Sequence, residues 1–199
     1  MALLTGLLWS TYYTVHGRFR AWIKAGVFQQ ILHKSIEAAI HKWGSPQCFF
    51  SDTSSVKAPL ARFAGKNPTD RGKNGVKKAV VIDWNRIILS ILIDSANRHD
   101  SKLLLPYLDE LAPFLGKPKP MITDSAWDAK KLREQLAKSN LALFAATNTR
   151  GAKSKLKIIP KGRWRIEQIS CWTKTKNSFL AFCQLAAAVH NFRLGGVFG

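Results

Sequence analysis

Apolar residues recur at helical spacing over the first 45 positions. Phe19, Trp22 and Ile23 share one helical face, and the same i, i+3, i+4 rule continues across Val27–Ile40. Gly26 separates the two runs, so the pattern predicts two helices. Two roles stay open for their aromatic side chains, packing in a core or stacking on bases, and packing is the simpler.

Two β-branched runs in the middle of the chain predict a hairpin. Val76–Ile82 and Ile87–Ile93 have the length of strands, and Asp83–Arg86 supplies turn residues between them. The second run is nearly all apolar, which predicts a central strand that is covered on both faces. After it, His99 and Asp100 fit either a corner that caps the next helix or a metal or acid/base pair.

Shorter apolar runs predict further strands that stop at polar residues. Gln47–Ser51 is closed by Asp52, and Lys119–Thr123 is closed by Asp124. Val56–Gly75 contains two Pro, three Gly and five Lys or Arg and is predicted to be a loop, for which phosphate contact and simple solvation are both open. Leu141–Ala146 is predicted to be a further strand. The remaining predicted helices are Leu103–Leu115, a helix capped by Ser125 with buried Ala129, Leu132, Leu136 and Ala137, a helix that starts over Trp164–Trp172 and carries Glu167, and a last helix from Asn177 or Ser178 to Gly195.

The last of these helices is apolar nearly all round, which predicts that it is buried. Taken in order, the elements are a helical pair, a hairpin, and then strands that alternate with helices. This order predicts an α/β fold with a mixed sheet flanked by helices.

The charge of the chain adds most to this picture. The 199 residues include 31 Lys and Arg against 12 Asp and Glu, a net charge of +19. Self-repulsion of this size does not help folding, so it indicates a polyanionic partner, and nucleic acid comes first. An acidic membrane surface is a poor second, because no basic amphipathic helix stands alone.

The composition also excludes several classes of protein. A hydrophobic content of 46% is typical of a globular chain and not of a disordered one. No apolar run reaches the roughly 20 residues of a membrane span, and the short apolar start lacks the features of a signal peptide. The three cysteines form no CxxC pair, so we expect reduced thiols in a cytoplasmic protein and no zinc site.

Three acids stand out on this basic chain. Acids at strand ends converge at one edge of an open α/β sheet, so Asp52 and Asp124 could meet there, with Glu167 approaching from a flanking helix. Gathered carboxylates repel one another unless a cation neutralises them, and oxygen ligands favour Mg²⁺ or Mn²⁺. Two such ions can promote in-line displacement at phosphorus. The alternative for Asp52, which precedes Thr and Ser, is a turn or capping residue.

Several motifs then agree, in order, with one protein family. They are DTSSVKA (Asp52–Ala58), GKNPTDRGKNGVKK (Gly65–Lys78), IDSANRHDSKLL (Ile93–Leu104), DSAWDAKKLREQL (Asp124–Leu136) and GRWRIEQ (Gly162–Gln168). They resemble DDE transposases of bacterial insertion sequences, specifically the insertion sequence five group. The resemblance spans roughly residues 14–194.

This resemblance implies an RNase H-like catalytic core over residues 46–199, preceded by a partial helical DNA-binding region over residues 1–45. It places Asp52, Asp124 and Glu167 as the catalytic, metal-binding acids, with Mg²⁺ or Mn²⁺ as cofactor. The implied partner is double-stranded DNA, both the terminal inverted repeats and the target, bound by a homodimer at the bacterial nucleoid. The residues expected to bind DNA, some from charge and some from the resemblance, are Arg18, Arg20, Lys66, Arg71, Lys73, Lys77, Arg163, Arg165 and Lys174.

Three hypotheses for function follow. The first is a transposase that cuts DNA strands at the ends of an element and joins them to target DNA. The second is a DNA-binding remnant without catalysis, favoured by a segment after Glu167 that is shorter than in the family; the chain itself would be a second-frame product or a truncated copy. The third, an RNA-coating structural protein, is disfavoured by the buried strands and the three acids.

Overall fold

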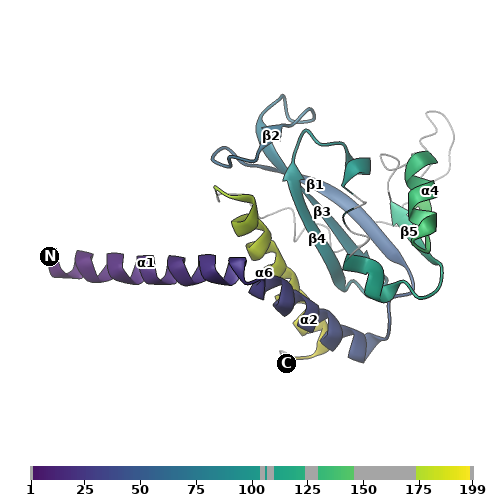
Figure 1. The fold of residues 1–199 in the computed structure, drawn as a ribbon, viewed down its shortest axis with the longest axis horizontal. Coiled ribbons are helices and arrows are strands. Elements are labelled where there is room, and N and C mark those ends of the chain that lie inside the picture. Colours follow the sequence, from purple (N-terminus) through teal and green to yellow (C-terminus); the bar gives the residue numbers. More distant parts are fainter. Residues whose placement is uncertain (1, 104–105, 107–109, 124–129, 146–173, 198–199) are drawn as a thin grey trace.

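The computed structural model describes the chain except for residues 1, 104–105, 107–109, 124–129, 146–173 and 198–199 (Figure 1). The described helices and strands are α1 (Ala2–Lys24), α2 (Val27–Trp43), β1 (Phe49–Lys57), β2 (Gly65–Lys66), β3 (Asn74–Asp83), β4 (Ile88–Ser95), β5 (Lys119–Thr123), α4 (Lys130–Lys138), β6 (Leu141–Ala145) and α6 (Lys176–Gly195), with short 3-10 turns at Asp100–Lys102 and Ala112–Phe114. None of the described helices has the length and hydrophobicity that crossing a membrane requires.

A mixed sheet organises the molecule. Strand β3 pairs antiparallel with β1 on one side and with β4 on the other, and the short β2 extends the β4 side. Beyond β1, strands β5 and β6 continue the sheet in parallel. Three antiparallel strands followed by two parallel ones, with helices around them, confirm the predicted mixed α/β fold.

The predicted hairpin forms β3 and β4, but the prediction that Ile87–Ile93 is central is wrong. Among the described strands β4 pairs with β3 alone. Its apolar residues are nevertheless buried, Ile91 to 5% and Ile93 to 2% exposure, because α6 packs against the strand. A continuous apolar run therefore indicates that a strand is buried, not that other strands pair with both of its edges.

The prediction that a strand ends at Asp52 is also wrong. β1 continues through Asp52 to Lys57, since β3 offers a pairing partner at every step from Phe49↔Asp83 to Lys57↔Gly75. The predicted loop Val56–Gly75 is correspondingly shorter. Polar side chains did not stop the strand because backbone pairing, and not side-chain polarity, sets its length.

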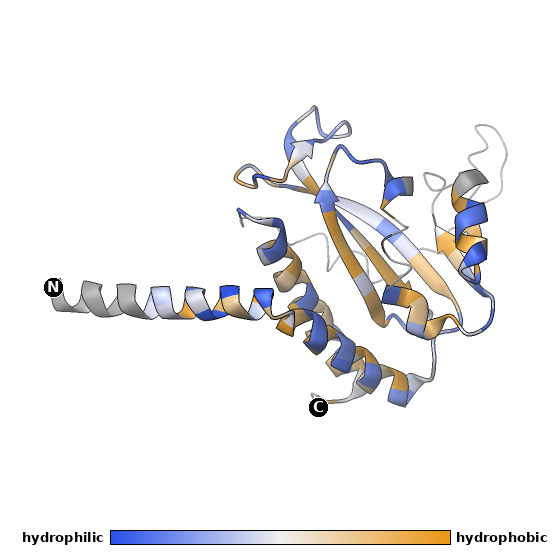
Figure 2. Ribbon diagram, in the orientation of Figure 1, coloured by the Kyte–Doolittle hydropathy of each residue, from blue (hydrophilic) through white to orange (hydrophobic). Residues whose placement is uncertain are grey.

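The two N-terminal helices are confirmed. Gly26 separates them with a positive φ of 69°, a conformation in which glycine has no steric penalty. α2 packs against α6, and α1 extends away from the rest of the molecule (Figure 1). Hydrophobic residues concentrate on the strands and on the faces that α2 and α6 turn towards them (Figure 2). The buried residues of α2 are Phe28, Leu32, Ser35, Ile36 and Ala39.

Two predictions about α6 need correction. Its N-cap is Thr175, whose Oγ1 accepts a hydrogen bond from the Ser178 backbone N–H at 3.3 Å, and not Asn177 or Ser178. The helix is not buried all round, because Phe182 is 47% exposed and Leu185 is 38% exposed. Its hydrophobic surface exceeds what α2, β4 and the end of α1 cover, even though Phe182 stacks on Phe19 of α1.

Helix α4 and the segment after β4 agree with the sequence only in part. Leu132 and Leu136 of α4 are buried as predicted, whereas Ala137 is exposed; Ser125 and Ala129 lie outside the described residues. The predicted helix Leu103–Leu115 lies partly outside the described residues; the 3-10 turn Asp100–Lys102 precedes it, and the 3-10 turn Ala112–Phe114 lies near its end.

Candidate active site

Asp52 lies inside β1 and its position is fixed by the sheet. It pairs with Val80 of β3, which in turn pairs with Ile91 of β4. Directly paired residues point to the same face, and the strand alternates faces, so Ser54, Lys78 and Ile93 share the face of Asp52. We call this the Asp52 face. Asp52 itself is half-buried there.

The other predicted acids, Asp124 and Glu167, lie outside the described residues, as do Arg163 and Arg165. Strand β5 ends at Thr123, immediately before Asp124, and its pairing with β1 includes Phe50↔Ile122. Within the described part of the chain, no three His, Cys, Asp or Glu side chains come together to hold a metal ion. The predicted donor set consists only of carboxylates, and its chemistry fits Mg²⁺ or Mn²⁺.

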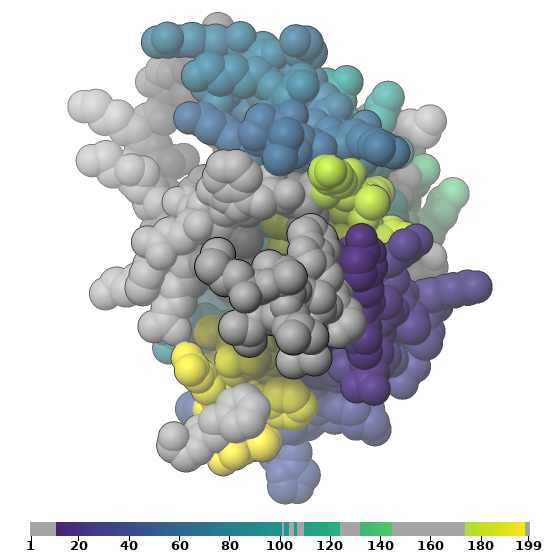
Figure 3. Space-filling view, turned by 90° about the vertical axis from the view of Figure 1, so that its left-hand side faces the viewer, coloured from purple at the N-terminus to yellow at the C-terminus, as the bar shows by residue number. Residues whose placement is uncertain are grey.

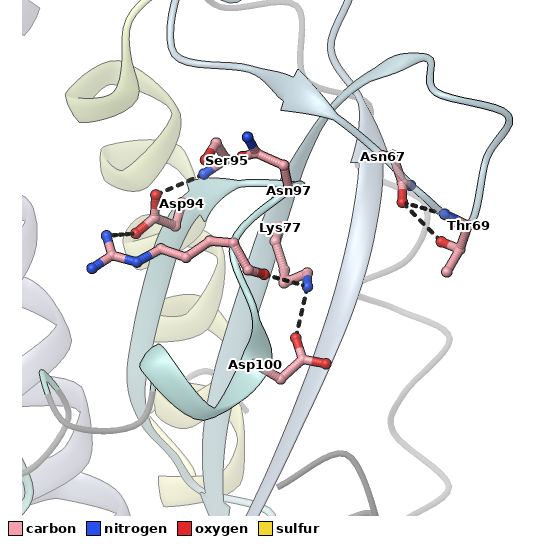
Figure 4. Close-up of polar contacts among 8 residues, drawn as sticks. Asn67, Thr69, Lys77, Asp94, Ser95, Asn97 and Asp100 are labelled. Atoms are coloured by element: carbon pink, nitrogen blue, oxygen red, sulfur yellow. Dashed lines mark hydrogen bonds and ion pairs between the residues drawn. The ribbon is translucent and has the colours of Figure 1, made fainter.

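The face opposite to Asp52 also carries charge, and there the partners are explicit. The Nζ atom of Lys77 lies 2.8 Å from Oδ1 of Asp100 and 2.8 Å from the Arg98 carbonyl oxygen (Figure 4). Arg98 in turn pairs with Asp94 at 2.6 Å. The Lys77 side chain is only 13% exposed, so it is the least accessible of the described residues predicted to bind DNA. Asp100 therefore takes part in a corner ion pair, beside the turn that it begins.

The loop Asn67–Lys73 projects from the start of β3. Asn67 is 7% exposed, and its Oδ1 accepts hydrogen bonds from the Thr69 backbone N–H at 3.1 Å and the Thr69 hydroxyl at 2.8 Å (Figure 4). The backbone N–H of Gly72 donates to the Asn67 carbonyl at 2.9 Å. Arg71 and Gly72 both have positive φ, 51° and 70°, which closes the turn. The loop is thus folded on itself.

This folded loop and the end of the adjoining strand β2, which carries Lys66, present cations to solvent. Lys66, Arg71 and Lys73 are all exposed, as the sequence predicts for phosphate contacts. Together with the end of β1 the loop lines a hollow of about 310 Å³ that includes Lys57 and Lys73. In Figure 3 this region forms the upper end of the face shown, above the start of α6.

The remaining predicted DNA contacts lie at two places. Arg18 and Arg20 are exposed on α1. Lys174 is exposed just before α6, and its carbonyl accepts a hydrogen bond from the Arg62 backbone N–H at 3.3 Å. This bond connects the start of α6 to the segment between β1 and β2.

Sequence reasoning missed two charged residues of the sheet. Asp83 is 1% exposed at the end of β3; burial raises the pKa of its carboxyl, and the hydrogen bond from the Ile87 backbone N–H at 2.7 Å opposes that rise. Burial, and secondarily the Asp83 charge, raises the pKa of the Cys48 thiol. Lys78 is also 1% exposed, on the Asp52 face. Because successive side chains of a strand lie on opposite faces, the sequence could have predicted that Lys78 and its neighbour Lys77 lie on different faces of β3.

Comparison with known proteins identifies similar chains. A family model described as the transposase DDE domain matches residues 43–183. A curated Burkholderia cepacia protein, assigned as a transposase for insertion sequence element IS402, is 30% identical over 115 residues; the match covers 54% of this chain and 53% of the relative. The chain thus spans about half the length of that relative.

Two solved structures show remote similarity. The Mos1 mariner paired end complex with Mn is 10% identical over 85% of this chain and 62% of that chain, with a TM-score of 0.41. The piggyBac transposase synaptic complex with hairpin DNA is 12% identical over 58% of this chain and 27% of that chain, with a TM-score of 0.36.

Proposed function

Since the chain belongs to the transposase DDE domain family, we propose that it cuts DNA strands at the ends of an insertion sequence and joins them to target DNA. The site we propose is formed by Asp52, Asp124 and Glu167. The proposed subgroup is the insertion sequence five group, from the sequence motifs quoted above. The activity, the substrates and the partners of the full-length relatives belong to this proposal.

The observation that carries the proposal is the register of β1 against β5. Phe50 and Ile122 face each other on neighbouring parallel strands. Asp52 follows Phe50 by two residues, and Asp124 follows Ile122 by two residues. Equal offsets from a paired position, in strands that run the same way, favour two carboxylates at the same level of the sheet.

Each acid of the proposed site has a separate task. Asp52 and Asp124 would hold a shared Mg²⁺ or Mn²⁺, and Glu167 would hold the second ion. When bound, the ions would polarise the phosphodiester and activate a water or a 3′-hydroxyl as nucleophile. Pairing of Asp52 with Val80 of β3, and of Phe50 with β5 two residues earlier, holds this part of β1 in place, which suits a reaction sensitive to small displacements.

We assign binding of the DNA backbone to lysine and arginine side chains. We assign phosphate contact to the loop cations Lys66, Arg71 and Lys73, and to Arg18 and Arg20 on α1. Such contacts fix the register of a protein on duplex DNA without reading sequence. By resemblance, Arg163, Arg165 and Lys174 would hold phosphates near Glu167, and Lys77 contributes through its charge. The DNA would be the terminal inverted repeats and the target, paired by a homodimer at the bacterial nucleoid.

A nicking assay tests the proposal. The substrate is a supercoiled plasmid that carries the DNA flanking the gene on both sides, and the reaction contains Mn²⁺. Asp52→Asn should lower nicking at least about 100-fold, because it removes a metal ligand. The matched control is Asp83→Asn, a second acid of the same sheet on the opposite face, which should nick like the parent.

Binding is measured in parallel by gel shift. Asp52→Asn should bind the flanking DNA like the parent, since the loop cations are unchanged. Equal nicking by the parent and Asp52→Asn would disprove the site. Salt-dependent binding with no nicking by any sample would establish the alternative, a catalytically inactive DNA-binding remnant.

A further inference from the structure

The hollow beside the loop Asn67–Lys73 contains a polar group that no described residue satisfies. Asn67 lines the hollow and is 7% exposed. Its Oδ1 accepts the bonds from the backbone N–H and the hydroxyl of Thr69 (Figure 4). A backbone N–H can only donate, so this bond fixes which end of the amide is the oxygen. The amide nitrogen Nδ2 therefore points away from that N–H, and it forms no hydrogen bond with any residue that the structure describes.

Two lysines line the same hollow. Lys57 lies at the end of β1 and Lys73 at the end of the loop, and both are exposed. Within the described part of the chain neither ammonium group is paired with an acid. Asp70 is the only acid among the described residues of the lining, so two positive charges face one negative charge. A buried neutral donor beside two ammonium groups favours an anion over a cation.

The hollow is separate from the Asp52 face. Ser55 and Lys57 alternate along β1 with Ser54 and Val56, so their side chains lie on the opposite face of the sheet. The volume of about 310 Å³ is at the lower end of the roughly 300–1,000 Å³ of small-molecule sites. The hollow therefore has room for one phosphate group and the sugar beside it, and this phosphate would not be the one that reacts near Asp52.

We propose that this hollow is a phosphate-binding site. Nδ2 of Asn67 donates to a phosphate oxygen, and Lys57 and Lys73 neutralise the charge of the phosphate. The same chemistry fits a phosphate of the DNA backbone and free phosphate. With DNA as the source, the site deepens the proposed function by adding a contact outside the reacting centre, and it rests on that function only for the choice of DNA.

The first test follows the side-chain amide of Asn67 by ¹H–¹⁵N NMR in the full chain. One sample is titrated with a short DNA duplex and another with inorganic phosphate, each at constant ionic strength. Movement of the Asn67 amide signals with the duplex supports the site and identifies DNA as the source. Movement with inorganic phosphate alone supports the site and identifies free phosphate. No movement in either titration would overturn the proposal.

The second test measures duplex binding by fluorescence anisotropy over a salt series. Asn67→Ser keeps a side-chain oxygen that can accept the Thr69 bond but removes the amide donor. It should weaken binding roughly tenfold and leave the slope of log K against log [salt] unchanged, because a neutral donor releases no counterion. A merely structural Asn67 would instead displace the loop cations on substitution and lower the slope, and that result would overturn the proposal. Unchanged duplex affinity would overturn DNA as the source.

Lys57 gives the opposite signature. Lys57→Met should lower the slope by about 0.9, because one phosphate contact is lost. Lys138→Met removes the same charge from an exposed position of α4 and should change the slope much less. Equal changes in the two variants would show that Lys57 acts only through net charge and would contradict its place in the site.

An isosteric variant serves if Asn67→Ser does not fold. Asn67→Asp keeps the oxygen that accepts the Thr69 bond and replaces the donor by an acceptor. It should weaken duplex binding more than Gln29→Glu, which adds the same charge at an exposed position of α2, and equal losses would overturn the site. These variants leave the proposed catalytic acids intact, so absence of nicking by the parent would disprove the proposed function without changing the results expected for the hollow.

Discussion

Strand β3 begins and ends at tight turns that share their local chemistry but differ in their surroundings. At its start, Asn67 accepts a hydrogen bond from the Thr69 backbone N–H. At its end, Asp83 accepts one from the Ile87 backbone N–H, and Arg86 adopts a positive φ of 69°. Both turns therefore use a short polar side chain to replace a backbone acceptor.

The turn at the end of β3 is hydrogen-bonded to helices α2 and α6, whereas the loop Asn67–Lys73 presents its cations to solvent. Asn191 of α6 accepts a hydrogen bond from the Ile88 backbone N–H at 2.9 Å and donates to the Ile88 carbonyl at 2.8 Å. The Arg86 carbonyl lies 3.1 Å from His190, and the Asn85 side chain donates to the Trp43 carbonyl at 3.4 Å.

This difference between the two turns distinguishes polar groups that stabilise the fold from polar groups that are available to bind a partner. A turn whose hydrogen bonds reach other elements contributes to stability, and changing it should cost folding free energy. A turn that satisfies itself and exposes cations contributes little to stability, and changing its charges should affect a partner. The following predictions test this distinction.

The largest effect is expected at the exposed loop. Replacing Lys66, Arg71 and Lys73 together by Ala should weaken binding to duplex DNA roughly 100-fold near physiological salt and flatten the slope of log K against log [salt] by about 2.7. Fluorescence anisotropy over a salt series measures both quantities. Urea unfolding of the same variant should stay within about 0.5 kcal/mol of the parent, because these side chains are exposed.

The matched control for the loop is a triple alanine variant of the exposed α2 and α4 cations Lys34, Lys42 and Lys138, which removes the same charge elsewhere. It should lower the salt slope much less. Equal slopes for the two triple variants would mean that binding follows net charge alone. That result would contradict the assignment of DNA contact to the cations at the start of β3.

The next effect belongs to Asn191, which is 0% exposed. Asn191→Ala leaves the buried backbone N–H and C=O of Ile88 without their side-chain partner and should cost about 2–4 kcal/mol of unfolding free energy. Urea denaturation measures this loss. Asn177→Ala, at an exposed position of the same helix, should cost little, and nicking per folded molecule should not change in either variant. A loss for Asn191→Ala no larger than that for Asn177→Ala would contradict the structural role.

The smallest effect is a pH dependence at Asp83. Because burial raises its pKa, the folded state binds this proton more tightly than the unfolded chain does. The resulting stabilisation is fully present below the ordinary carboxyl range, about pH 4, and is lost as pH rises through the raised pKa.

Asp83→Asn removes this proton and keeps an oxygen that can accept the Ile87 hydrogen bond. Its unfolding free energy should therefore vary less with pH than that of the parent, and should exceed the parent value near neutrality. Urea unfolding across the acidic to neutral range measures both. A profile parallel to that of the parent would show that Asp83 does not contribute to the pH dependence.

The order of the elements was predictable because local signals fix it. The apolar period of Val27–Ile40, the break at Gly26 and the β-branched runs of the hairpin each depend on residues close in sequence. Strand length and strand neighbours were not predictable in this way. The continuation of β1 past Asp52 depends on pairing with β3, and the burial of β4, which pairs with β3 alone among the described strands, depends on the helix that covers it.

The sequence by itself determined the helical pair, the hairpin and the excess of basic residues, because spacing and composition carry that information. The choice of Asp52 as a candidate ligand came from motifs that resemble a family, since the strand end predicted there was wrong. Only the tertiary structure decided that Lys77 and Lys78, identical neighbours in the chain, have different surroundings. The reason is physical: a strand alternates its side chains between two faces, and which face becomes the core and which meets an acid depends on pairing with distant residues.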